Sequence, residues 1–152
     1  MKQTRRILAS ETQIEAIKAG RITAFSTLIK LPEWAGDGEG ISILSHLGDL
    51  AEHVHDGQWG VYVNAGPVSG APILAPTQPG SVLVAARVPE VVRVRVTSIR
   101  LRRLYDLTDE DAHAEGFESA DATRVFFLIR DNIVDQPVNP WIWVVAFEVI
   151  ND

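Results

Sequence analysis

Four acidic side chains and one histidine fall within the eleven-residue stretch LTDEDAHAEGF, residues 107–117. Thr108 is a favourable N-cap, and acids at 109–111 suit the positive end of a helix dipole. Gly116 is a residue type that commonly follows the last turn of a helix. The stretch therefore predicts a short helix that starts after Thr108 and stops at Gly116.

That helix does not account for His113 and Glu115. A carboxylate in the last turn opposes the helix dipole, so it needs a nearby cation, a ligand or some other compensation. A carboxylate in a cleft can also act as a general acid or base. We predict Glu115 as a catalytic or ligand-binding residue. The alternative, that it caps the helix or pairs with an arginine, stays open, and His113 is interpreted as a surface residue.

The remaining histidines do not form a recognisable metal motif. His53 and His55 would share a face only on a strand, whereas His46 and Asp49 would share one only on a helix, and Glu52 and Asp56 add no regular spacing. The chain has no cysteine, so thiolate sites and disulfides are excluded. No phosphate-binding glycine loop or nucleophile elbow is present. The sequence predicts no metal site and no cofactor.

A second unusual stretch is VVRVRVTSIRLRRL, which carries arginines at alternating positions. The alternation changes phase at Thr97-Ser98, and one extra residue there, a β-bulge, would keep the aliphatic side chains on one face. The arginines at 93, 95, 100 and 102 would then share the other face. They could bind RNA phosphates, or they could form a solvated face paired with acids such as Glu148. The second interpretation is favoured, because a net charge of −6 opposes strong nucleic-acid binding.

Composition places limits on the whole chain. With 152 residues, 46% hydrophobic and 22% charged, it fits one globular domain over 1–152. A long insertion is expected at about 30–80. The N-terminus lacks a signal-peptide core and no segment is long and apolar enough to span a membrane, so we expect a soluble cytoplasmic protein.

The elements that must position these residues can be read from periodicity and end signals. We expect strands at 5–9, 21–29, 59–64, 81–88, 90–104 and 141–150, and helices at 10–20, 41–54, 108–116 and 119–133. Residues 30–40 are expected to be a loop, and 57–80 to hold long, mobile loops. For residues 119–133 an apolar strand is the alternative to a helix. If the segment is a helix, the residues expected to face inward are Ala122, Val125, Phe126, Ile129 and Ile133.

The last strand, WIWVVAFEVI, is apolar on both alternating faces, which is typical of a strand covered on both sides. The order of elements lacks the regular strand–helix alternation of a parallel sheet. It favours an α+β fold, a closed or nearly closed β-barrel with helices packed across its openings.

The segment VRVRVTSIRLRRLYDLTDEDAHAEGF, followed later by NPWIWVVAFEVI, resembles the ASCH family, in particular forms carried by bacteriophages and prophages. These have a strand of the type I-x-V-x-V-x-x-V-R-x-x-x-L and then L-x-D-I-T-x-E-D-A-x-x-E-G. The likeness covers about 90–117 and 139–147, is weaker over 7–27, and is absent from 30–80. It implies a PUA-like β-barrel with a cleft for RNA or nucleoside ligands, in the host cytoplasm if the protein is phage-encoded.

Some small ASCH proteins are amidohydrolases that deacetylate acetylcytidine with a Lys, a Thr and a Glu. In this resemblance Gly20 and Glu115 match the family pattern. Ile22, Phe25 and Thr27 stand where the family has Lys, Thr and Arg. Since Ile and Phe cannot transfer protons or attack a carbonyl, we expect this chemistry to be lost or rebuilt.

Three functions follow as hypotheses. The first is a non-catalytic module that binds RNA or a nucleotide; its expected ligand-binding residues are Gly20, Arg21, Thr23, Ser26, Arg100 and Tyr105, with Glu115 beside them. Tyr105 could stack on a base, although packing is favoured. The second is a hydrolase or ribonuclease acting on a modified nucleoside or single-stranded RNA, with Glu115 as acid or base and Ser26 or Thr23 assisting. The third is an accessory protein that contacts a partner through 30–80.

Overall fold

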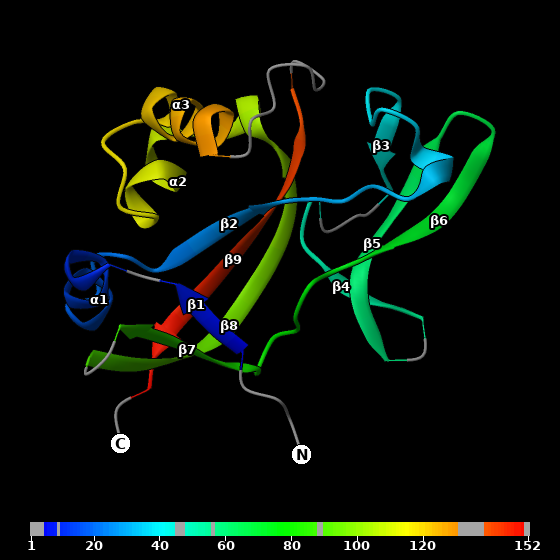
Figure 1. Cartoon of the computed structure of the whole chain (residues 1–152). Coiled ribbons are helices and arrows are strands. Elements are labelled where there is room, and N and C mark those ends of the chain that lie inside the picture. The colour runs from blue at the N-terminus through cyan, green and yellow to red at the C-terminus, as the bar shows by residue number, and fades with distance from the viewer. Residues whose placement is uncertain are drawn as a thin grey trace.

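The computed structural model describes residues 5–8, 10–44, 48–55, 57–87, 90–130 and 139–150. Its strands form a five-stranded and a smaller four-stranded sheet (Figure 1). The elements, with 3-10 helices marked η, are β1 (Arg5–Leu8), α1 (Glu11–Lys18), β2 (Ala24–Leu28), η1 (Glu33–Ala35), β3 (Ile41–Ile43), β4 (Glu52–His55), β5 (Gln58–Ala65), β6 (Val68–Leu74), β7 (Val82–Arg87), β8 (Glu90–Arg103), η2 (Leu104–Asp106), α2 (Asp109–Ala114), α3 (Ala120–Arg130) and β9 (Trp141–Val149).

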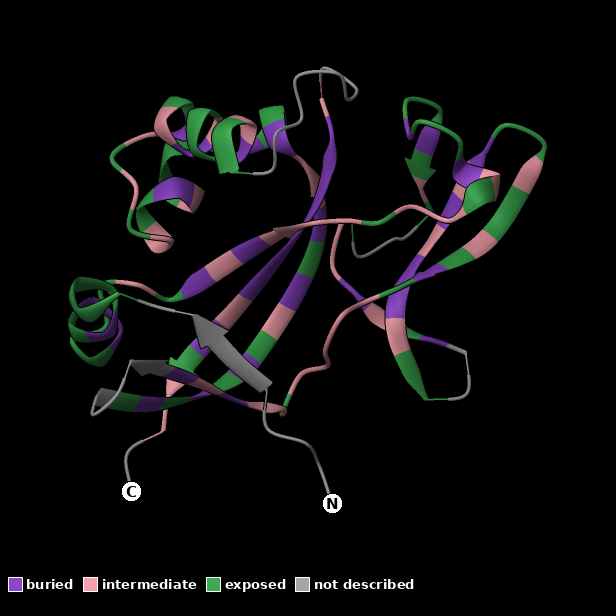
Figure 2. Ribbon diagram, in the orientation of Figure 1, coloured by how far each residue is buried: buried purple, intermediate pink, exposed green. Residues whose placement is uncertain are grey.

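The larger sheet has the order β1-β7-β8-β9-β2 and curls into a half-barrel (Figure 1). β9 lies inside it, between β8 and β2, as its two apolar faces predicted. Trp143, Val145 and Phe147 join a core shared with α1 and the second sheet, whereas Ile142 and Val144 join a core under η2 and α3. The larger sheet thus separates two hydrophobic cores, and both faces of β9 are buried (Figure 2).

The predicted bulge in the arginine strand is confirmed. The register of β8 with β9 shifts between Val96 and Ser98. Val94 and Val96 before the shift and Ile99 after it are all buried, whereas Arg95 is exposed. One additional residue in β8 therefore keeps the aliphatic side chains from Val92 to Leu101 on one buried face.

Two helix starts also agree with the sequence. Ser10 and Gln13 form a capping box at α1. Thr108 and Asp111 form one at α2, which ends before Gly116 in a left-handed conformation with φ of 89°. Each box satisfies backbone N–H groups that a helix start leaves without intrahelical partners.

The expected helix at 41–54 is wrong. Ile41–Ile43 forms β3 and Glu52–His55 forms β4, and both strands pair with β5. Gly48 has a φ of 74°, which a helix cannot contain, and Ala51 donates its N–H to Ile99 O at 2.7 Å. The apolar residues of this segment matched the helical period, but sheet pairing determines the structure.

Residues 57–80 also differ from the expected mobile loops. β5 and β6 form an antiparallel hairpin that contains most of this segment. Val61, Val63 and Ile73 are buried in the first core. Glycines and prolines made the region resemble loops, whereas in the structure they occupy turns, the edge strand β6 and, at Gly60, the interior of β5. The single domain with an insertion at about 30–80 stays a prediction.

α3 is a helix as expected, but it turns a different face inward. Ala120, Thr123 and Phe127 are buried, while Val125, Phe126 and Ile129 are exposed. Ala122 is half-buried, and Ile133 lies outside the described residues. The buried residues of α3 pack on α2 and η2. The positions of α2 and η2, and not apolar content alone, therefore determine which face of α3 is buried.

α1 contacts β7 and β8, and α2 packs with α3. The placement of helices across barrel openings stays a prediction. Among the described residues, no helix is sufficiently long and apolar to cross a bilayer.

Candidate functional site

A cleft of about 580 Å³ lies between α1, β2, β9 and the α2–α3 region. This volume is within the range of small-ligand sites. The residues that line it are Gln13, Ile17, Ile22, Ala24, Phe25, Ser26, Glu115, Gly116, Phe117, Phe126, Phe127, Arg130 and Phe147. Of the residues predicted from sequence, it thus brings Glu115 and Ser26 together in one cavity.

Glu115 is placed by the end of α2. It is the C-cap residue, and Ala114 just before it accepts a hydrogen bond from Thr23 N–H at 2.7 Å, which ties α2 to the start of β2. Gly116 follows with a positive φ, and a Cβ added there would lie 3.0 Å from Ile22 Cδ1. The positive φ favours glycine at this turn, and the close approach of Ile22 leaves little room for a Cβ.

The central contact of the cleft joins two residues that are 89 positions apart. Ser26 Oγ donates a hydrogen bond to Glu115 Oε2 at 2.7 Å. Ser26 is buried and Glu115 is half-buried. Ser26 faces the helices because Ala24 and Leu28, two residues to either side on β2, pack in the core under α3.

The surroundings of Glu115 raise the pKa of its carboxyl from 4.5 to about 7. Burial is the main cause, because the apolar walls solvate the carboxylate poorly. The hydrogen bond from the Ser26 hydroxyl opposes it, nearby Asp111 adds repulsion, and the Ser26 backbone amide and Arg130 each lower the pKa again. At neutral pH the cleft therefore holds comparable amounts of the acid and the carboxylate.

Aromatic rings dominate the cleft walls. Phe25 and Phe147 come from the sheet, with ring centroids 6.2 Å apart. Phe117 and Phe126 come from the α2–α3 region, at 5.1 Å. Arg130 lies with its guanidinium 5.0 Å from the Phe126 ring centre. Such a cavity can enclose a flat, apolar group and place one acid and one cation at its polar edge.

Three predicted binding residues lie beside the cleft and do not line it. Gly20, Arg21 and Thr23 form the connection from α1 to β2, and all three are exposed. Arg21 N–H is bonded to Ala16 O at 2.8 Å, and Thr23 contributes the backbone contact to α2. Their structural role is to fix the start of β2 against the helices.

Arg100 and Tyr105 lie elsewhere. Arg100 pairs with Asp49 at 2.7 Å, and the Tyr105 ring stacks under the Arg124 guanidinium at 5.1 Å. Neither residue lines the cleft.

The arginine face of β8 pairs with acids of the same chain. Arg95 lies 3.7 Å from Glu148, and Arg102 contacts Asp49 at 3.2 Å and Asp111 at 2.5 Å. These pairs agree with the second interpretation of the arginines, a solvated face matched to acids. Through Asp111, Arg102 also supports the capped start of α2.

The histidines are dispersed. His53 stacks on Trp59 at 4.4 Å, and exposed His113 has Nε2 2.9 Å from Glu118 O. His46 and Asp56 lie outside the described residues. Within the part of the chain that the structure describes, no three His, Cys, Asp or Glu side chains are grouped to hold a metal ion.

Sequence reasoning missed several cleft residues, above all Phe117, Phe126 and Arg130. The sequence pattern predicts Phe126 in the core, because it is apolar and lies on a helix. Its neighbour Phe127 is the buried one, and this difference depends on the phase of α3 against α2. The sequence signal that could have indicated Phe117 is its position directly after Gly116, which ends α2.

Comparison with solved structures shows two similar folds. An ASCH domain from Lactobacillus crispatus superposes with a TM-score of 0.54 at 14% identity, covering 95% of this chain and 79% of that chain. A protein from Enterococcus faecalis of the family DUF984 gives a TM-score of 0.59 at 10% identity, covering 99% and 82%. No family model and no curated protein matches the sequence. The chain therefore has an ASCH-like fold.

Proposed function

We propose that the Glu115 cleft binds the base of a nucleotide or of single-stranded RNA. The observation that carries this proposal is the half-buried carboxyl of Glu115, with its raised pKa, in a cavity walled by phenylalanine rings. Flat rings are the surfaces on which proteins stack unpaired bases. The acid supplies the hydrogen bonds that fix a base edge. The ASCH-like fold is consistent with this proposal, because the resemblance to that family implies a cleft for RNA or nucleoside ligands.

The protonation state of Glu115 narrows the kind of base. A neutral carboxyl offers one O–H donor next to one carbonyl acceptor. Cytosine and adenine present the complementary pair, a ring nitrogen that accepts and an exocyclic amine that donates. Oε2 can accept from this amine while it also accepts from Ser26, because a carboxyl oxygen has two lone pairs. Guanine would require the carboxylate instead.

Arg130 lies at the cleft beside Phe126 and supplies a cation for a phosphate. The arrangement therefore matches a nucleotide better than an uncharged aromatic compound. In this arrangement β2 contributes an aromatic ring for the base, the end of α2 contributes the acid, and α3 contributes the cation for the phosphate.

Binding of the four ribonucleoside monophosphates, measured by calorimetry at pH 6 and pH 8, tests the proposal. We expect cytidine and adenosine monophosphates to bind more tightly at pH 6, where Glu115 is mostly protonated. Glu115→Gln presents a donor and an acceptor at both pH values, so it should lose the part of the pH dependence that comes from Glu115 and keep only the part that comes from the phosphate, whose second pKa is about 6. Glu115→Ala should bind weakly at both pH values. Glu110→Gln, on the exposed first turn of the same helix, is the control. Absence of binding by all four nucleotides would refute the proposal.

A second candidate function rests on the Ser26–Glu115 hydrogen bond. A serine that donates at 2.7 Å to a carboxyl with a pKa of about 7 has the geometry of a nucleophile and its general base. The oxygen of Ser26 would attack the acyl carbon while its proton passes to the Glu115 carboxylate, and the bond to the leaving group would break as that group takes up the proton. A water molecule, deprotonated by Glu115, would then hydrolyse the acyl-serine, which releases the acid and restores Ser26.

Acetylcytidine distinguishes the two candidates. Pure binding predicts no release of acetate, because Ile22 and Phe25 occupy the positions where the family has Lys and Thr. Hydrolysis predicts release on the order of once per second, which Ser26→Ala abolishes. We favour binding.

A further inference from the structure

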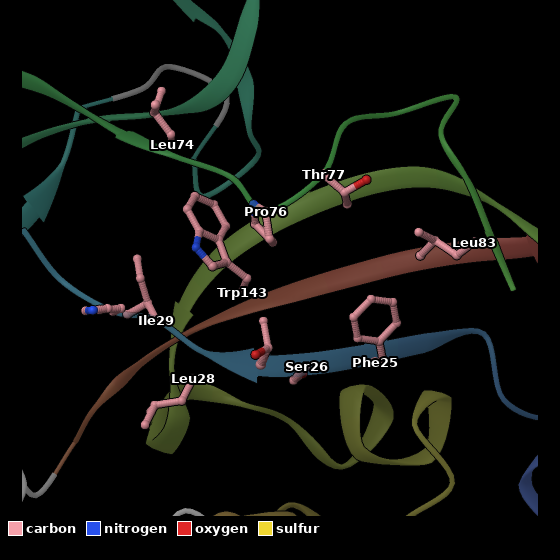
Figure 3. Close-up of a pocket in the computed structure, with 11 residues that line it drawn as sticks. Phe25, Ser26, Leu28, Ile29, Leu74, Pro76, Thr77, Leu83 and Trp143 are labelled. Carbon is pink, nitrogen blue, oxygen red and sulfur yellow. The ribbon is translucent and has the colours of Figure 1, made fainter. Parts of the chain in front are cut away.

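A second cavity, of about 550 Å³, opens on the other side of β2 (Figure 3). Trp143 and Leu83 lie on its apolar side, and Thr77, from the connection between β6 and β7, faces them. Lys30 also lines this cavity, two residues after the end of β2. It combines an apolar floor with a hydroxyl and a cation, so it is suited to a ligand that is partly flat and partly anionic.

The two cavities meet at consecutive residues. Phe25 and Ser26 line both of them. Successive side chains on a strand point to opposite faces, and Phe25 packs with the first core while Ser26 reaches Glu115. The cavities are therefore neighbouring chambers on the two faces of one strand.

The strand between them presents an outer edge. β2 is the last strand of its sheet and pairs with β9 on one side. Thr23 O accepts from Phe147 N–H at 2.8 Å and Ile29 N–H donates to Trp141 O at 3.1 Å, so odd-numbered residues face β9. In an antiparallel ladder the residues between them, Ser26 and Leu28, turn their N–H and C=O groups to the other side. Leu28 thereby offers a donor and an acceptor at the second chamber.

We infer that the second chamber receives the next nucleotide of the chain whose base lies at Glu115. Ser26 and Lys30 are four residues apart, about 13 Å for extended backbone. A nucleoside held at Glu115 does not extend that far, whereas a phosphodiester that crosses the edge of β2 leads a second unit to Leu28 and Lys30. The ligand class is thus a dinucleotide or a single-stranded oligonucleotide. This inference rests on the function proposed above.

The test compares cytidine 5′-monophosphate, the 5′-phosphorylated dinucleotide pCpC (called CpC below) and a short oligocytidylate at pH 6. The terminal phosphate of this dinucleotide matches that of the mononucleotide, and its linking phosphate is the one expected near Lys30. We expect CpC to bind about tenfold more tightly than the mononucleotide, as one additional stacked base provides. Lys30→Gln should remove most of this gain and reduce the salt dependence of CpC binding by about 0.7 in log–log slope, the value for one phosphate on a single strand. Thr77→Trp, which fills the second chamber, should abolish the gain. Both variants should leave the affinity for the mononucleotide unchanged.

Lys18→Gln is the matched control, because Lys18 lies on α1 and lines neither chamber. Two results would show that the second chamber is not a nucleotide subsite: CpC binds no more tightly than the mononucleotide, or Lys30→Gln and Thr77→Trp leave CpC binding unchanged. In both cases the mononucleotide still binds, so the function proposed for Glu115 stands. If neither ligand binds, both fall. If an extended peptide, and not CpC, protects Leu28 N–H from hydrogen exchange, the edge of β2 docks protein strands and the inference is overturned.

Discussion

Replacing Glu115 with glutamine is expected to make the protein more stable at alkaline pH. Folding raises the pKa of Glu115 from 4.5 to about 7, mainly by burial among apolar side chains. A carboxyl whose pKa is higher in the folded state stabilises that state while it is protonated. This contribution is fully present below pH 4.5 and is lost as the pH rises through about 7. Glutamine has no proton to lose, and its amide oxygen can still accept from Ser26.

The size of the effect follows from the change in pKa. One pKa unit corresponds to about 1.4 kcal/mol, so a rise from 4.5 to about 7 corresponds to about 3 kcal/mol. The free energy of unfolding of Glu115→Gln, minus that of the original protein, should therefore increase by about 3 kcal/mol between pH 4 and pH 8. It should be level below pH 4.5 and above about pH 8.

Urea unfolding followed by tryptophan fluorescence at several pH values between 4 and 9 measures this difference. Taking the difference removes the pH dependence of every other group, provided that the slope against urea stays the same. Glu110→Gln, which is exposed at the start of α2, should give a nearly constant difference. A constant difference for Glu115→Gln as well, or one that decreases with pH, would refute the argument that burial controls this carboxyl.

Three further predictions concern the supports of the cleft. Gly116→Ala places a Cβ on a residue in a left-handed conformation and against a neighbouring side chain, so the free energy of unfolding measured in urea should decrease by about 1–2 kcal/mol. Gly66→Ala should cost less, because φ is also positive there but the space around a Cβ is open. Ser26→Ala removes a hydrogen bond that favours the carboxylate, so the pKa of Glu115 should rise further, as measured by NMR titration. Arg102→Gln breaks the pairs to two aspartates and should lower stability by about 1 kcal/mol, less in high salt; no change in stability would mean that the network does not support α2.

Features that depend on neighbouring residues could be predicted from the amino-acid order. β9 is central because its residues are apolar at both odd and even positions. The bulge in β8 follows from a change of phase at Thr97-Ser98. The capped start of α2 follows from Thr108 and Asp111, three residues apart. Each of these signals operates within a strand or a turn, so local spacing is sufficient to predict it.

The chemistry of the cleft depends on contacts between residues that are far apart in the sequence. Glu115 meets Ser26 across 89 residues, and its pKa depends on walls contributed by α1, β2, β9 and α3. The same holds for α3, where Phe126 and Phe127 both line the cleft but only Phe127 is buried, because of where α2 and η2 lie. Burial and electrostatic interaction depend on distance in space, so residues from separate elements must first be brought together before an ordinary glutamate becomes a group that titrates near neutral pH.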